Sequence, residues 1–101
     1  MEFPYRLYPT QNMWTFIKLD TSNGRMWQVQ YSLEGDNYRF EKTLNLNVLT
    51  QKQIAGRFEL YPTQNIYNFI LIDKVSGDTW QVQWSKDEEN QAVIPIRQLE
   101  Y

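Results

Sequence analysis

This 101-residue chain contains no cysteine and no histidine. Without cysteine no disulfide can stabilise the fold, which is the usual device of small secreted domains, so the composition favours a reducing, cytoplasmic setting. The two absences exclude Cys/His zinc sites, haem ligation and iron–sulfur clusters, and we expect no cofactor or metal. They also exclude Ser–His and Cys–His nucleophile pairs, which leaves only carboxylates, Lys and Tyr for acid–base chemistry.

A surplus of one charge and a long apolar run are missing as well. The chain has 10 basic and 12 acidic residues and a net charge of −2, with no basic run, which argues against nucleic acid as a partner. Its apolar stretches are far too short to span a membrane. The first residues lack the basic region and apolar run of a signal peptide. We therefore expect neither nucleic acid nor membrane as a partner.

Aromatic residues are plentiful, with 4 Trp, 7 Tyr and 5 Phe. Each can bury about 150–250 Å² of surface, so a few of them can supply most of a small core. The length of the chain allows one domain and no second independent core.

The chain is an internal duplication. Residues 7–32 read LYPTQNMWTFIKLDTSNGRMWQVQYS, residues 60–85 read LYPTQNIYNFILIDKVSGDTWQVQWS, and 15 of these 26 positions are identical at an offset of 53. We predict a single domain over 1–101 that consists of repeat one (1–43), a connector (44–56) and repeat two (57–101).

Apolar and polar residues alternate with a period of two, most clearly in the two WQVQ segments, which predicts β-strands. The fold class is therefore all-β, with about four strands per repeat. We expect two antiparallel meanders, related by an approximate two-fold and packed as a small sandwich or barrel. The alternative is that each repeat is one blade of a propeller that several chains assemble.

The repeat, LYPTQN followed by FI, Asp, Gly and WQVQ, resembles that of a group of short bacterial proteins of unknown function. The resemblance covers roughly residues 3–43 and 56–96. It implies no activity and no assigned site residues, and it supports only the interpretation as a repeat.

The hairpin register follows from which side chains should share a face. A loop of three residues, Ser22–Gly24, pairs Leu19 with Trp27 and Ile17 with Val29, whereas a two-residue loop mixes apolar and glutamine side chains. The three-residue loop requires a left-handed glycine. In repeat two the same register pairs Ile72 with Trp80 and Ile70 with Val82. We therefore predict positive φ at Gly24 and Gly77, and a core that contains Trp27, Val29, Trp80 and Val82.

The opposite face in that register combines apolar residues with glutamines in both repeats. A purely solvated face needs no phenylalanine in each copy, so we expect this face to be covered, between the repeats or in a homo-oligomer. The candidate interface residues are Phe16, Gln28, Gln30, Phe69, Leu71, Gln81 and Gln83.

The identical LYPTQN segments are the candidate ligand loops. Turn chemistry explains Pro, Thr and Asn, and this is the structural interpretation. The functional interpretation is that tyrosine rings and side-chain amides bind a carbohydrate or a peptide. The candidate residues are Tyr8, Thr10, Gln11, Asn12, Tyr61, Thr63, Gln64 and Asn65.

Carboxylates give only weak functional signals. Asp20 and Asp73 are interpreted as turn residues, since one carboxylate per loop is too few for a calcium site. The acidic residues after the WQVQ strands are typical of solvated loops rather than of a glycosidase pair. We therefore expect a non-enzymatic binding or interaction module with two quasi-equivalent faces and a protein, peptide or carbohydrate ligand. The alternative is a self-assembling structural subunit, and an enzyme ranks third.

Overall fold

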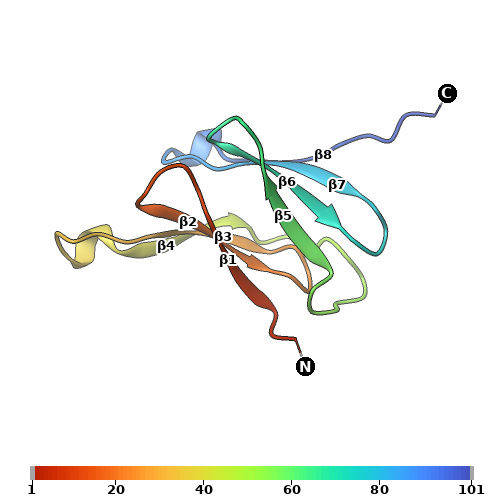
Figure 1. The fold of residues 1–101 in the computed structure, drawn as a ribbon, viewed down its shortest axis with the longest axis horizontal. Helices are drawn as coiled ribbons and strands as arrows, with labels where there is room; N and C mark the ends of the chain where they lie inside the picture. The colour runs from red at the N-terminus through yellow and green to blue at the C-terminus, as the bar shows by residue number, and fades with distance from the viewer. Residues whose placement is uncertain (1, 101) are drawn as a thin grey trace.

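The computed structural model describes residues 2–100 and consists of two four-stranded antiparallel sheets (Figure 1). The first sheet contains β1 (Tyr5–Pro9), β2 (Thr15–Asp20), β3 (Met26–Gln30) and β4 (Phe40–Asn45). The second contains β5 (Phe58–Pro62), β6 (Asn68–Asp73), β7 (Thr79–Gln83) and β8 (Ala92–Pro95). Consecutive strands are neighbours in both sheets, so the predicted all-β duplication of a meander is confirmed.

Short 3-10 turns precede the last strand of each sheet, η1 (Asp36–Tyr38) and η2 (Glu88–Asn90). The first lies at the tip of the β3–β4 hairpin, which projects from the body of the molecule (Figure 1). Proline closes the first strand of each repeat, at Pro9 and Pro62, because it has no N–H to continue the ladder. Within residues 2–100, no helix has the length and apolar character needed to cross a membrane.

An aspartate and a glycine shape the β2–β3 hairpin and its repeat-two equivalent. The carbonyl oxygen of Asp20 accepts the Gly24 N–H at 3.0 Å, and its Oδ1 accepts the Ser22 N–H at 2.9 Å. In repeat two the carbonyl oxygen of Asp73 accepts the Gly77 N–H at 2.7 Å. The φ angles of Gly24 and Gly77 are +87° and +82°, which confirms the predicted left-handed conformation.

The hairpin loop contains four residues, 21–24, and not the three that the sequence predicts. Leu19 therefore lies opposite Met26, and the predicted pairing of Leu19 with Trp27 is wrong. The extra turn residue is Thr21, whose N–H and hydroxyl both donate to the carbonyl oxygen of Pro4, at 2.7 and 2.6 Å, so it cannot extend the ladder toward β3. One added residue moves the side chains of one strand to the other face.

Repeat two shows the same four-residue loop, over 74–77. Leu71 lies opposite Trp80 and Phe69 opposite Val82, so the predicted pairs of Ile72 with Trp80 and Ile70 with Val82 are also wrong. The Lys74 N–H donates to the carbonyl oxygen of Arg57 at 2.8 Å, as Thr21 does to Pro4 in repeat one.

The two sheets pack through faces that are not equivalent. The first sheet buries the side that we call the Leu19 face, which includes Ile17, Leu19, Met26 and Gln28. The second sheet buries the side that we call the Leu71 face, which includes Phe58, Leu60, Phe69, Leu71 and Val82.

At the repeat offset Leu71 corresponds to Lys18, which lies on the other side of its sheet from Leu19. The predicted packing of two antiparallel meanders against each other is confirmed. The approximate two-fold is corrected, since a two-fold contact joins equivalent surfaces.

This arrangement also decides which predicted core residues are buried. Val82 is fully buried, but Trp27, Val29 and Trp80 are only half-buried. Trp27 and Val29 lie on the outer side of the first sheet, because the register places them beside Lys18 and Phe16. The core consists of Ile17, Leu19, Met26, Leu44, Phe58, Leu60, Phe69, Leu71, Val82 and Trp84.

Polar contacts join the two sheets around this core. The Phe58 N–H donates to the carbonyl oxygen of Thr21 at 2.8 Å. The side-chain amide of Gln28, which is 3% exposed, donates to the carbonyl oxygen of Ser85 at 3.1 Å. Arg6 and Glu59 form an ion pair at 3.7 Å between the first strands of the two repeats.

A buried ion pair anchors the β5–β6 end of the second sheet. Arg57 donates from Nε and a terminal nitrogen to the two carboxylate oxygens of Asp73 at 2.8 and 2.9 Å, and the Asp73 side chain is 3% exposed. Burial by itself raises the pKa of Asp73. The bonds from Arg57 and from the N–H groups of Val75 and Ser76 outweigh it and lower the pKa to about 2.

Candidate functional site

The two LYPTQN loops have the same internal hydrogen bonds. In the first, the Thr10 hydroxyl donates to the carbonyl oxygen of Thr15 at 2.7 Å, and Asn12 Oδ1 accepts the Trp14 N–H at 2.9 Å. In the second, Thr63 donates to the carbonyl oxygen of Asn68 at 2.8 Å, and Asn65 Oδ1 accepts the Tyr67 N–H at 2.9 Å. Thr and Asn thus shape the turn, as the structural interpretation holds.

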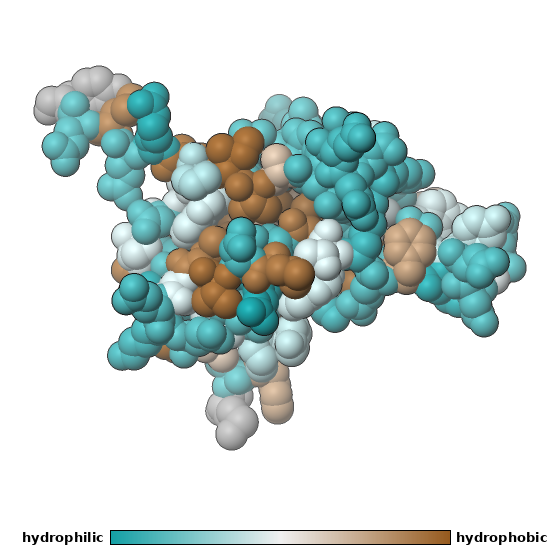
Figure 2. Space-filling model, turned by 180° about the vertical axis from the view of Figure 1, so that it is seen from behind, coloured by the Kyte–Doolittle hydropathy of each residue, from teal (hydrophilic) through white to brown (hydrophobic). Residues whose placement is uncertain are grey.

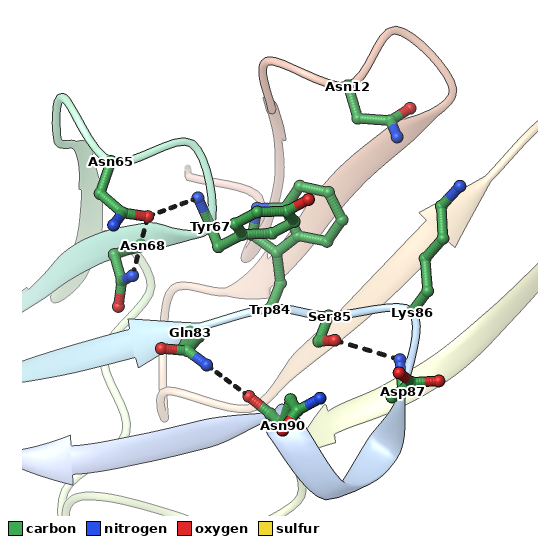
Figure 3. Close-up of a pocket in the computed structure, with 10 residues that line it drawn as sticks. All are labelled: Asn12, Asn65, Tyr67, Asn68, Gln83, Trp84, Ser85, Lys86, Asp87 and Asn90. Atoms are coloured by element: carbon green, nitrogen blue, oxygen red, sulfur yellow. Dashed lines mark hydrogen bonds between the residues drawn. The ribbon is translucent and has the colours of Figure 1, made fainter.

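These loops place an aromatic residue beside the end of the WQVQ strand. In repeat one the ring centroids of Trp14 and Tyr31 are 5.1 Å apart with an interplanar angle of 53°. In repeat two the rings of Tyr67 and Trp84 are also 5.1 Å apart, at 52°. Figure 3 shows the ring of Tyr67 lying over that of Trp84. The duplication therefore produces two aromatic pairs of the same geometry.

A pocket opens beside each aromatic pair. The larger, in repeat two, has a volume of about 500 Å³ and is shown in Figure 3. It is lined by Asn12, Asn65, Tyr67, Asn68, Gln83, Trp84, Ser85, Lys86, Asp87 and Asn90. The smaller, in repeat one, has a volume of about 340 Å³. It is lined by Trp14, Gln30, Tyr31, Ser32, Leu33, Glu34, Tyr38 and Lys86. Both volumes lie in the range of ligand pockets.

The two pockets are built from equivalent positions. Trp14, Gln30 and Tyr31 of the smaller pocket correspond to Tyr67, Gln83 and Trp84 of the larger one at the repeat offset. Each pocket also receives a residue from the other repeat, Asn12 in the larger and Lys86 in the smaller. The packing of the two sheets therefore contributes to both pockets.

A glutamine side chain lines each pocket and donates a hydrogen bond to a backbone carbonyl. Gln83 donates its amide to the carbonyl oxygen of Asn90 at 2.7 Å, and Gln30 donates to that of Tyr38 at 3.3 Å. The side-chain oxygens of both glutamines accept no hydrogen bond from any residue in 2–100. Each pocket thus holds an amide oxygen in a fixed position, available to a ligand hydroxyl or N–H.

The candidate ligand loops only partly converge on these pockets. Asn12 and Asn65 line the larger one together, whereas Gln11 and Gln64 are exposed at the loop tips. Tyr8 packs against the core with its hydroxyl buried, and the Tyr61 hydroxyl donates to Glu59 at 3.0 Å. Both tyrosines therefore lie away from the pockets.

The candidate interface residues do not share one face. Phe16 is half-buried on the outer side of the first sheet, whereas Gln28 belongs to the buried Leu19 face. Phe69 and Leu71 lie in the core between the sheets, and Gln81 on the outer side of the second sheet donates to Asn68 Oδ1 at 2.9 Å. The prediction that phenylalanines and glutamines share a face is wrong because of the longer turn.

The aromatic pairs are the site feature that the sequence prediction missed. Trp14 and Tyr67 are equivalent but not identical, and so are Tyr31 and Trp84, so a search for identical positions passes over them. Their signal is that aromatic character is retained at both positions. Comparison of the chain with protein-family models, curated proteins and solved structures finds no match, so the pockets are interpreted from their own geometry.

Proposed function

We propose that this chain is a non-enzymatic binding module that takes carbohydrate in its two quasi-equivalent pockets. The observation that carries the proposal is the repetition of one arrangement, an aromatic pair beside an anchored glutamine, at equivalent positions of both repeats. A feature needed only for folding would not have to leave an open pocket beside it twice.

The exposed aromatic rings suit the apolar face of a sugar. Tyr67 is 46% exposed and Tyr31 is 40% exposed, while their partners Trp84 and Trp14 are less exposed and hold them in place. A ring held this way offers a rigid apolar surface and loses little conformational freedom when a ligand binds.

The polar lining suits hydroxyl groups, which both donate and accept hydrogen bonds. In the larger pocket Asn12, Asn65 and Asn68 supply side-chain amides, and Ser85 supplies a hydroxyl (Figure 3). Lys86 lines both pockets, and its ammonium group adds hydrogen-bond donors to each. This mixture of amides around one aromatic face favours a neutral polyhydroxylated ligand.

The carboxylates at the pockets favour binding over catalysis. Among the described residues that line them, the larger pocket has one carboxylate, Asp87, and the smaller has one, Glu34, and both are exposed. Glycoside hydrolysis ordinarily needs two carboxyl groups on opposite sides of the bond. A single exposed carboxylate can instead accept a hydrogen bond from a ligand hydroxyl.

The proposal is tested by screening the labelled chain on a glycan array and titrating the best-retained saccharide calorimetrically. We expect two sites per chain for the parent. Tyr67→Ala should weaken the site in repeat two and Tyr31→Ala the site in repeat one, each leaving the other site at the affinity of the parent. Loss of the ring should weaken its site by about tenfold or more, since an aromatic contact contributes about 0.5–1.5 kcal/mol beyond its buried area.

Phe3→Ala is the matched control, because Phe3 is 81% exposed and lies outside both pockets. It should leave both sites unchanged. A peptide array probed in parallel separates the two ligand classes. Retention on peptides alone would mean that the ligand is a peptide and not a carbohydrate. Saccharide binding that survives the combined Tyr67→Ala and Tyr31→Ala changes would place the site elsewhere.

A further inference from the structure

The packing of the two repeats leaves one face of each sheet open. The open side of the first sheet, which we call the Lys18 face, carries Tyr5, Leu7, Phe16, Lys18, Trp27 and Val29. The open side of the second sheet, which we call the Ile72 face, carries Tyr61, Ile70, Ile72, Thr79, Gln81 and Ile94. At the repeat offset the Lys18 face is the counterpart of the buried Leu71 face, and the Ile72 face is the counterpart of the buried Leu19 face.

Both open faces expose large apolar side chains. On the Lys18 face Tyr5 is 57% and Leu7 is 60% exposed, although their counterparts Phe58 and Leu60 are 1% and 2% exposed in the core. On the Ile72 face Tyr61 and Ile94 are 51% and 50% exposed. A cluster of apolar side chains is also visible on the side of the molecule seen in Figure 2. Paired strands that expose apolar residues in this number mark an interaction surface.

We propose that the chain associates head to tail with a second copy of itself, the Ile72 face of one copy docking on the Lys18 face of the next. The interface between the repeats is the template. Within each chain the Leu19 face of the first sheet packs on the Leu71 face of the second. The open Ile72 face is the counterpart of the Leu19 face, and the open Lys18 face is the counterpart of the Leu71 face. The association does not rest on the proposed carbohydrate binding.

The polar contacts of the internal interface have counterparts in the proposed one. Arg6 and Glu59, which pair internally, occupy equivalent positions with opposite charge, so Glu59 of one copy would meet Arg6 of the next. Gln28, which donates to the Ser85 carbonyl, has Gln81 as its counterpart, and Ser32 offers the equivalent carbonyl. Charge and hydrogen bonding are therefore complementary, and a copy docked in this way repeats contacts that the fold already makes.

Lys18 does not prevent this docking. Its Nζ lies 2.5 Å from Glu41 Oε1 and 5.0 Å from the centroid of the Trp27 ring. Covering the face would therefore bury a charge that is already paired and that lies over an aromatic ring. A lysine at position 18 also disfavours packing of the Lys18 face against a surface that does not fit it, because its charge would then be buried at a cost.

Head-to-tail contacts between unlike faces close into a ring when the rotation per unit allows it. Four-stranded antiparallel sheets stacked in this way around an axis form propellers of about four to eight blades. A chain of two such sheets would reach this number with two to four copies. The expected solution mass is therefore two to four times the 12.3 kDa of the chain.

The test uses two variants that each block one face with an arginine. Leu7→Arg blocks the Lys18 face and Tyr61→Arg blocks the Ile72 face, and both residues are more than half exposed, so the core is unaffected. Sedimentation should give an oligomer for the parent and a folded monomer for each variant alone. A mixture of the two should give a dimer with one copy of each, because only one compatible pair of faces remains.

Circular dichroism of both variants establishes that they fold. A parent that stays monomeric at high concentration would overturn the proposal. So would a Tyr61→Arg variant that still dimerises, since that would show the Lys18 face binding to itself, and so would a mixture that remains monomeric.

Discussion

Asp73 should make the stability of this protein sensitive to acid. Its pKa in the folded chain is lowered from 3.8 to about 2 by Arg57 and two backbone N–H groups, against the effect of burial. One pKa unit corresponds to about 1.4 kcal/mol, so the ionised carboxylate contributes about 2.5 kcal/mol to the free energy of unfolding. Because the folded pKa is depressed, this contribution is complete above about pH 5 and is lost as the pH falls toward about 2.

The perturbation is Asp73→Asn, which removes the charge while leaving a side-chain oxygen to accept the N–H groups of Val75 and Ser76. Urea unfolding followed by tryptophan fluorescence should be measured for parent and variant from about pH 6 to about pH 2. The difference between the two free energies of unfolding should shrink by about 2 kcal/mol across that range, because Asp73 is half protonated at about pH 2. Asp87→Asn, which removes an exposed carboxylate, corrects for the change in net charge. A difference that stays constant with pH would refute the role given to the ion pair.

Two further comparisons test the turn and the register by urea unfolding of the dilute chain. Gly24→Ala and Gly77→Ala should each cost about 1 kcal/mol because both φ angles are positive, and Gly24→Ala should cost more because a Cβ there lies 2.7 Å from Leu49 Cδ1. Equal costs would mean that Leu49 moves away freely. Leu71→Ala should cost about 2–5 kcal/mol and its half-buried neighbour Ile72→Ala clearly less; the reverse order would restore the three-residue loop.

Alternation and repetition predicted the fold class, the strands of both repeats and the conformation of the two glycines. They did not predict the register, and β6 shows why. Its sequence NFILID has Phe69 and Leu71 on one side and Ile70 and Ile72 on the other, so hydrophobicity cannot select the buried side. The selection comes from Asp73, whose carbonyl and carboxylate start the turn one residue earlier than the pattern suggests.

The pockets were predictable only in part. Asn12 and Asn65 belong to a conspicuous identical segment, and their presence at the larger pocket follows from it. Lys86 could not be predicted in this way, because it belongs to repeat two and reaches the pocket of repeat one only when the two sheets pack together. Contacts between elements that are distant in sequence leave no periodic signal in either element.

The unlike faces at the internal interface also bear on how the two halves could have diverged. After a duplication that joins equivalent surfaces, both copies of a residue keep the same surroundings and the same selective pressures. Here the two copies of a residue lie in different surroundings: Leu71 is enclosed in the core, whereas its counterpart Lys18 meets a carboxylate and an aromatic ring on the outer side of its sheet. Substitutions at position 71 are therefore filtered by volume and those at position 18 by charge. Exchanging the two halves within the chain would therefore place a lysine in the core where Leu71 now lies.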